Sequence, residues 1–136
     1  MPQPPSAPPI APDRLAAFVQ GLDGAVLLPD DDGYDAAREV IDATVDRRPA
    51  IIVGATSEDD VVRTVALARE TGAELAVRCG GHSIAGHSST EGGILLDLAG
   101  LDAIGIDPEG GVGTAGAGVP VSTGAPTVAS RVKRPL

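Results

Sequence analysis

The chain has 136 residues, of which 43% are hydrophobic and 21% are charged, and this length predicts a single domain. Ten basic residues stand against nineteen acidic ones, so the formal net charge is -9 and nucleic acid is not an expected partner. Aromatic residues make up only 1% of the chain, so alanine, valine, leucine and isoleucine must build the core.

Cysteine content and hydropathy indicate the compartment. The single cysteine, Cys79, excludes an internal disulfide, so nothing requires an oxidising environment. The sequence shows no basic region followed by an apolar run, which a secretory signal would need. No apolar stretch approaches the ~20 residues of a membrane span. We therefore expect a soluble, cytoplasmic protein with no membrane partner.

The first part of the chain predicts little regular structure. Six of the first twelve residues are proline, which fixes φ and removes backbone donors, so residues 1–12 are predicted to form a disordered leader. A short helix is predicted from about Asp13 to a stop at Gly21. After an acidic turn, a second helix is predicted from Tyr34 to about Ala43.

The clearest pattern lies in residues 50–78. A β-branched run at 50–53 is followed by a helix that Ser57 opens and Gly72 ends, with acidic residues in its first turn. The expected apolar face of this helix consists of Val61, Val62, Val65 and Ala68. A strand follows at 75–77, so the segment predicts a β-α-β unit with two parallel strands and a right-handed crossover.

Glycine dominates the next part of the chain. Thirteen of the eighteen glycines lie between Gly72 and Gly118, which predicts loops and close backbone approaches. Short strands are predicted at 94–98, 103–106 and 111–114. The expected fold class is therefore α+β, a small α/β domain with a β-α-β unit and short following strands.

The best candidate site is the glycine-rich loop directly after the second strand of the β-α-β unit, where open α/β sheets bind ligands. Residues 81–88 nearly match a phosphate-binding P-loop, but His87 stands at the lysine position and no helix is predicted to follow. Residues 81–85 are one residue from a nucleophile elbow, but Ala85 replaces the second glycine. Both patterns therefore fit the loop poorly.

Two further motifs are weak. Cys79, His82 and His87 could bind a metal ion, but no fourth ligand stands at a standard spacing. Residues 111–116 match the dinucleotide pattern G-x-G-x-x-G, but neither a helix nor an acidic residue follows them. No metal ligand set is therefore assigned.

Consecutive glycines after a strand favour a different site. They can turn a run of backbone N–H groups to one side, and such a nest binds a diphosphate without a lysine. The competing interpretation is an ordinary tight turn, with His82 and His87 as polar surface groups and Cys79 as a small buried apolar one. Arg78 fits an ion-paired arginine at a strand end and a diphosphate partner equally well, while Asp97 is expected to be structural.

The loop also resembles a known family. Arg78-Cys79-Gly80-Gly81-His82-Ser83, then Gly86-His87-Ser88 and residues 92–98, is similar to the flavin-binding loop and next strand of FAD-linked oxidases of the berberine-bridge and hexose-oxidase type. The resemblance covers about residues 24–119. It implies an N-terminal FAD-binding subdomain of the PCMH type with FAD as cofactor. The cofactor-binding residues that it implies are Arg78, Cys79, Gly80, Gly81, His82, Ser83, Gly86 and His87.

The same resemblance implies specific roles within the loop. Residues 79–83 would wrap the diphosphate, and His82 would be bonded to the 8α-methyl carbon of the flavin. Members of the family are longer and contain a substrate domain and a C-terminal segment that completes the flavin site. Residues 13–119 are therefore expected to be a partial FAD-binding domain, and residues 120–136 a disordered or non-family tail.

The abrupt change of composition after Gly118 suggests a truncated or frameshifted reading frame, which sequencing the DNA beyond Leu136 would test. No residue can be assigned as a catalytic base, so an oxidoreductase acting on sugars, alcohols or alkaloid-like compounds would bind its substrate only with the missing segments. The alternative is an inactive α/β remnant or interaction module that binds no cofactor.

Overall fold

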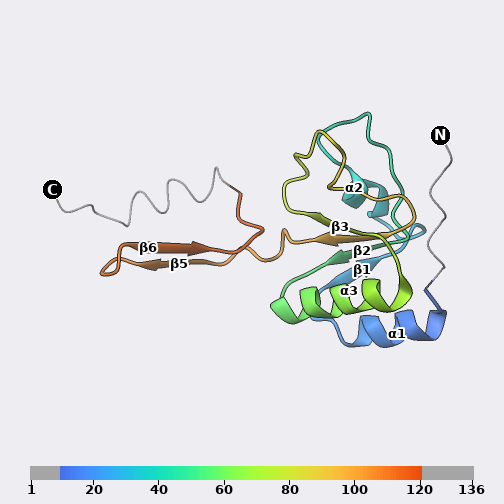
Figure 1. Cartoon of the computed structure of the whole chain (residues 1–136), viewed down its shortest axis with the longest axis horizontal. Coiled ribbons are helices and arrows are strands. Elements are labelled where there is room, and N and C mark those ends of the chain that lie inside the picture. Colours follow the sequence, from blue (N-terminus) through green and yellow to red (C-terminus); the bar gives the residue numbers. More distant parts are fainter. Residues whose placement is uncertain (1–9, 121–136) are drawn as a thin grey trace.

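The structure, a computed structural model, describes residues 10–120 (Figure 1). Most of the predicted leader and all but one residue of the predicted tail lie outside these described residues. Inside them, Ile10 packs against the core and Pro12 is the first residue of a helix, so ordered structure begins slightly before Asp13.

A four-stranded sheet forms the centre of the fold, with the order β1-β2-β4-β3. The strand β1 (Ala25–Leu27) runs antiparallel to β2 (Ile51–Gly54), whereas β4 (Ile94–Asp97) runs parallel to β2 and to β3 (Leu75–Arg78). The β-α-β unit is confirmed, and β4 lies between its two strands. The sequence analysis missed β1, because three residues after a glycine give too short a pattern to distinguish from a loop.

Alternate residues of β2 and β4 point to opposite faces of the sheet. One face packs on α1 (Pro12–Gln20) and α3 (Glu58–Thr71), and Phe18, Leu67 and Ile94 are buried there. The other face packs on α2 (Tyr34–Arg38), where Tyr34 and Leu95 are buried. Figure 1 shows α1 and α3 on one side of the sheet and α2 on the other.

The helix α3 begins and ends as predicted, but its buried face differs. The Ser57 hydroxyl accepts a hydrogen bond from the Asp60 amide at 3.2 Å, and Gly72 ends the helix with a φ of 69°. Val62 and Val65 are exposed, whereas Thr64 is buried because its hydroxyl donates to the Asp60 carbonyl at 2.7 Å. The predicted apolar face was therefore wrong for Val62 and Val65. It also left out Thr64, a polar residue that can be buried because its hydroxyl forms a hydrogen bond within the helix.

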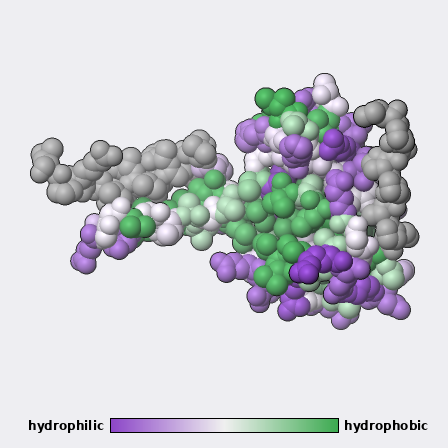
Figure 2. All heavy atoms as spheres, viewed as in Figure 1, coloured by the Kyte–Doolittle hydropathy of each residue, from purple (hydrophilic) through white to green (hydrophobic). Residues whose placement is uncertain are grey.

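The last two described strands form a separate antiparallel hairpin, β5 (Ile104–Asp107) and β6 (Val112–Ala115). The hairpin extends away from the sheet in Figure 1, and every residue of β6 is exposed. Figure 2 shows apolar residues gathered over the middle of the body and hydrophilic residues over much of the α1 and α3 layer. None of the helices within residues 10–120 has the length and apolar character that crossing a bilayer requires.

Candidate functional site

Three parallel strands place the candidate site at one edge of the sheet. The pairing register sets Gly54 beside Asp97 and Asp97 beside Arg78, so β2, β4 and β3 end in one row. The glycine-rich loop leaves β3 at this row, as the sequence analysis predicted. The loop therefore begins at the carboxyl ends of the parallel strands, where open α/β sheets bind ligands.

Arg78 is held by the protein itself. Its side chain is 8% exposed, forms an ion pair with Asp97 and donates to the Glu39 carbonyl at 3.0 Å. The other Asp97 oxygen accepts from the Ala99 amide at 2.9 Å. Of the two roles that the sequence left open, the structure shows Arg78 in the ion-paired one, and it shows Asp97 as a structural residue.

The turn at residues 79–83 has backbone donors to offer. Among residues 10–120, the amides of this turn donate to no protein acceptor. Gly81 is buried and has a φ of 72°, a conformation that favours glycine, and its carbonyl accepts from the Ile41 amide at 3.2 Å. The five amides of residues 79–83 are therefore available to donate to a ligand. The hydrogen bond from the Ile41 amide to the Gly81 carbonyl fixes the conformation of the turn.

The absence of a side chain at Gly80 leaves room for the imidazole of His82. A Cβ built on Gly80 would lie 2.4 Å from Cδ2 and 2.6 Å from Nε2 of His82. Only a glycine at position 80 lets the ring fold back against the turn without a shift. His82 is exposed, so its ring does not lie in the apolar interior.

The other predicted side chains of the loop do not gather around a metal ion. Cys79 and His87 are exposed, and the described part of the chain holds no cluster of three potential metal ligands. The exposed Cys79 thiol also contradicts the interpretation of this residue as a buried apolar group.

The second half of the loop, residues 83–89, forms two successive turns. The Gly86 amide donates to the Ser83 carbonyl at 3.1 Å, and the Ser89 amide donates to the Gly86 carbonyl at 3.2 Å. The His87 amide donates to the Ser83 hydroxyl at 3.1 Å. The Ser89 hydroxyl is buried and has no hydrogen-bond partner in residues 10–120, so this part of the loop also holds an unsatisfied polar group.

A segment without regular secondary structure, residues 39–48, lies along the loop and is called the wall below; it contains a turn in which the Val45 amide donates to the Asp42 carbonyl at 3.0 Å. It contacts the loop through the Ile41 amide on Gly81, and through the Gly92 amide, which donates to the Arg48 carbonyl at 2.9 Å. The prediction of a helix to Ala43 was wrong for residues 39–43, because Glu39 has an extended conformation with a ψ of 141°. Hydrogen bonds to a loop forty residues away fix this wall, and local sequence does not encode them.

Charged groups hold the wall in place. Arg38 forms ion pairs with Asp35 and Asp46, and its hydrogen bond to Asp35 holds the pKa of that carboxyl below its usual range. Arg48 also pairs with Asp35, at 3.2 Å, and lies over the Tyr34 ring. Arg47 differs from its neighbours, because no carboxylate within residues 10–120 lies within ion-pair distance of it.

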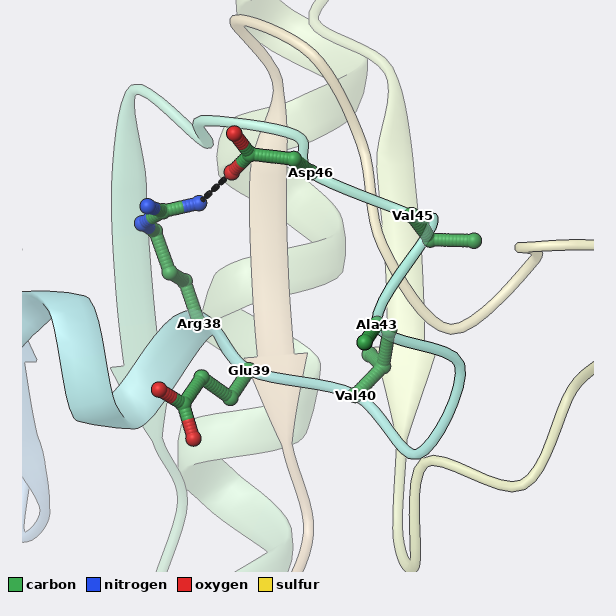
Figure 3. Close-up of a pocket in the computed structure, with 6 residues that line it drawn as sticks. All are labelled: Arg38, Glu39, Val40, Ala43, Val45 and Asp46. Carbon is green, nitrogen blue, oxygen red and sulfur yellow. Dashed lines mark hydrogen bonds and ion pairs between the residues drawn. The ribbon is translucent and has the colours of Figure 1, made fainter.

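A pocket of about 370 Å³ opens beside the wall. Figure 3 shows the Arg38 guanidinium turned toward Asp46 across it, with Val40 and Ala43 close together on another side. The residues that line it are Arg38, Glu39, Val40, Ala43, Val45 and Asp46. None of the eight predicted site residues is among them, so this pocket and the turn at 79–83 are different features.

Comparison with known proteins shows which family this sequence matches. The sequence profile of the family described as "FAD binding domain" matches residues 49–128, and the match ends inside the segment that the sequence analysis assigns to the tail. The chain is 39% identical over 98 residues to (R)-6-hydroxynicotine oxidase of Paenarthrobacter nicotinovorans, a match that covers 72% of this chain and 21% of the relative.

Solved structures agree on the fold. The crystal structure of 6-hydroxy-D-nicotine oxidase from Arthrobacter nicotinovorans matches with a TM-score of 0.70 and 39% identity, over 72% of this chain and 22% of that one. Glucooligosaccharide oxidase from Acremonium strictum, whose FAD is described as 6-S-cysteinyl and 8α-N1-histidyl, matches with a TM-score of 0.76 and 22% identity, over 85% and 25% of the two chains. The chain thus spans about a fifth to a quarter of the length of these relatives.

Proposed function

Because this chain belongs to the FAD-binding-domain family, as the resemblance of its loop predicted, we propose that residues 79–83 bind the diphosphate of FAD. The observation that carries this proposal is the set of five consecutive amides without a protein acceptor in the described residues. Backbone amides that point to one side at a sheet edge are a known means of binding phosphate without a lysine. The whole protein is then an FAD-dependent oxidoreductase.

The residues present fit such a group. FAD brings two negative charges and several acceptor oxygens, and the backbone amides of residues 79–83, which donate to no acceptor within residues 10–120, can bind them. The missing Cβ atoms at Gly80 and Gly81 allow backbone to come close to the ligand. The buried Ser89 hydroxyl supplies one further polar group nearby in sequence. Cys79, Ser83, Gly86 and His87 complete the set that we assign to the FAD site, while Arg78, which binds Asp97 and the Glu39 carbonyl, belongs to it as a support of the turn.

We assign His82 as the residue that attaches covalently to the 8α-methyl carbon of the flavin. Its ring nitrogen would replace one hydrogen of that methyl group, and a two-electron acceptor such as dioxygen would take up the two electrons and two protons released. A neutral imidazole is a nucleophile near neutral pH, and the His82 side chain is exposed beside the turn. The histidyl FAD of the Acremonium strictum oxidase supports this assignment by analogy. Once bound, the flavin would supply the hydride acceptor, while the chain's own residues bind and orient it.

We propose that a substrate binds mainly to segments that the longer relatives have outside the matched region. Oxidation of a sugar, an alcohol or an alkaloid-like compound requires a base and a closed cavity over the flavin, and we assign neither role to residues 10–120. The partial-domain boundaries at 13–119 and a cytoplasmic location stay predictions.

The absorbance spectrum of the freshly purified chain tests the proposal. We expect a yellow protein whose flavin stays with the precipitate after acid denaturation. The variant His82→Ala should lose this acid-stable flavin. The variant His87→Ala should keep it, because His87 is also an exposed histidine of the same loop, which we assign to the FAD site but not to the covalent bond. Flavin that is released completely by acid from the unmodified chain would contradict the His82 assignment. A chain that takes up no FAD would favour the inactive remnant.

A further inference from the structure

Arg47 makes two contacts to the carbonyls of the glycine-rich loop. Its Nη1 donates to the Gly86 carbonyl at 2.8 Å and to the Ser89 carbonyl at 3.1 Å. These carbonyls belong to two successive turns, so a single guanidinium holds both. Arg47 stands on the wall, thirty-nine residues before Gly86 in the chain, and the two segments lie together above the sheet in Figure 1.

The loop is shaped to receive this side chain. Gly86 has a φ of 78° and is buried, and a Cβ at this position would lie 3.3 Å from Nη2 of Arg47. Such a distance is tighter than most real Cβ contacts, so any larger residue would press on the guanidinium. Glycine at position 86 is therefore favoured both by the positive φ of the turn and by the close approach of Arg47.

The charge of Arg47 is not neutralised by a neighbouring acid. Within residues 10–120, Arg14, Arg38, Arg48 and Arg78 all have carboxylate partners, and Arg47 has only carbonyl oxygens. A positive charge bound to the carbonyl side of a loop polarises its peptide groups, which makes their N–H groups better donors. Arg47 thus adds positive charge beside residues 79–90, which contain no Asp, Glu, Lys or Arg.

We propose that Arg47 is a positioning residue of the FAD site, which fixes residues 83–89 in the conformation that binds the cofactor. The inference rests on the proposed function of the loop. It assigns to Arg47 no contact with FAD, since the guanidinium acts through the carbonyls of Gly86 and Ser89. The contact also depends on the irregular course of the wall at 39–48, because a helix continuing through this segment would place Arg47 elsewhere.

The test compares Arg47→Ala and Arg47→Lys with Arg48→Ala, all in a His82→Ala chain in which FAD binding is reversible. Two quantities are measured: the dissociation constant for added FAD, and hydrogen exchange at the Gly86, His87 and Ser89 amides without FAD. We expect Arg47→Ala to weaken FAD binding roughly ten- to a hundredfold, the effect of losing one charge-assisted hydrogen bond or more. Exchange at the three amides should become faster, while the Ile94 and Leu98 amides of the sheet stay protected.

The remaining outcomes separate the possibilities. Partial recovery of both quantities in Arg47→Lys, with Arg48→Ala like the parent, supports a positioning role, because lysine can reach one carbonyl. Faster exchange with unchanged FAD affinity shows a merely structural role and overturns the proposal. If neither the unmodified nor the His82→Ala chain binds FAD, the proposed function fails; unchanged exchange in Arg47→Ala would then also show that Arg47 does not hold the loop.

Discussion

Gly81 shows how one residue fixes the shape of the site. Its φ of 72° lies in the left-handed region, where a side chain costs about 1 to 2 kcal/mol. A Cβ at this position would meet Cδ of Arg78 at 3.5 Å and Cα of Val40 at 3.6 Å, which are ordinary contacts. The backbone conformation, rather than a collision, therefore requires glycine at position 81.

The variant Gly81→Ala tests this requirement. We expect it to lose about 1 to 2 kcal/mol of unfolding free energy and to bind FAD more weakly, because relief of the strain reorients the neighbouring amides. Gly72→Ala is the matched control, since Gly72 has a φ of 69° and open space around it but ends α3 far from the loop in sequence. Urea unfolding should show similar losses for both variants. Equal FAD affinity in both would contradict the role of Gly81.

The loop residues could be predicted from the sequence, whereas the residue that holds them could not. Gly80, Gly81 and His82 are adjacent and follow a strand, so local order alone indicated a site. Arg47 is distant in sequence, and its neighbours Asp46 and Arg48 look equally suited to a surface role. Only the tertiary contacts with Gly86 and Ser89 distinguish it.

At the scale of elements, a buried carboxylate joins the start of α3 to the chain before β1. Asp60 is 1% exposed, and its oxygens accept from the amides of Asp23 at 2.8 Å, Gly24 at 3.0 Å and Thr56 at 2.9 Å. Burial alone would raise the pKa of Asp60, but these amide donors together outweigh it and hold the pKa below its ordinary value. The sequence indicated only the position of Asp60 in the first turn of the helix.

The variant Asp60→Asn should cost roughly 2 to 3 kcal/mol of unfolding free energy at neutral pH, because an amide offers these donors an uncharged and single acceptor. The neighbouring Asp59→Asn is exposed and should cost less than about 1 kcal/mol. Urea unfolding of the three chains at pH 7 measures both losses.

The pH dependence of the same variants follows from the lowered pKa. The charged Asp60 contributes stability above its unfolded pKa of about 3.9, and this stability is lost as the pH falls through the lower native pKa. Asparagine does not titrate, so Asp60→Asn should lose less stability than the parent below about pH 4. Parallel pH profiles for the two chains would contradict this role of Asp60.

At the scale of the whole molecule, the parallel strands and their crossover helix were predictable, and the arrangement around them was not. Strong patterns in residues 50–78 indicated β2, α3 and β3, and short strands were also predicted close to β5 and β6, although their pairing into a hairpin was not. The insertion of β4 between β2 and β3, the short β1 and the irregular wall at 39–48 all depend on pairing between distant segments. Such pairing leaves no local period in the sequence.

Two elements within residues 10–120, the edge strand β3 and the hairpin of β5 and β6, are only partly covered by the rest of the described chain. The edge strand β3 exposes 47% of Val77, and both strands of the hairpin are largely exposed. A two-stranded hairpin is marginally stable without further packing. We therefore expect the body around the sheet, rather than the hairpin, to carry any FAD binding by this chain, which spans 21% of the length of (R)-6-hydroxynicotine oxidase.

The most direct test of that binding follows the backbone amides of residues 79–83 in a ¹H–¹⁵N NMR titration of the chain with FAD. If these amides bind the diphosphate, the resonances of Gly80, Gly81 and His82 should move downfield and their exchange with solvent should slow, whereas Gly72 should not change. Flavin that binds, as shown by its altered fluorescence, while these three resonances stay in place would contradict the account.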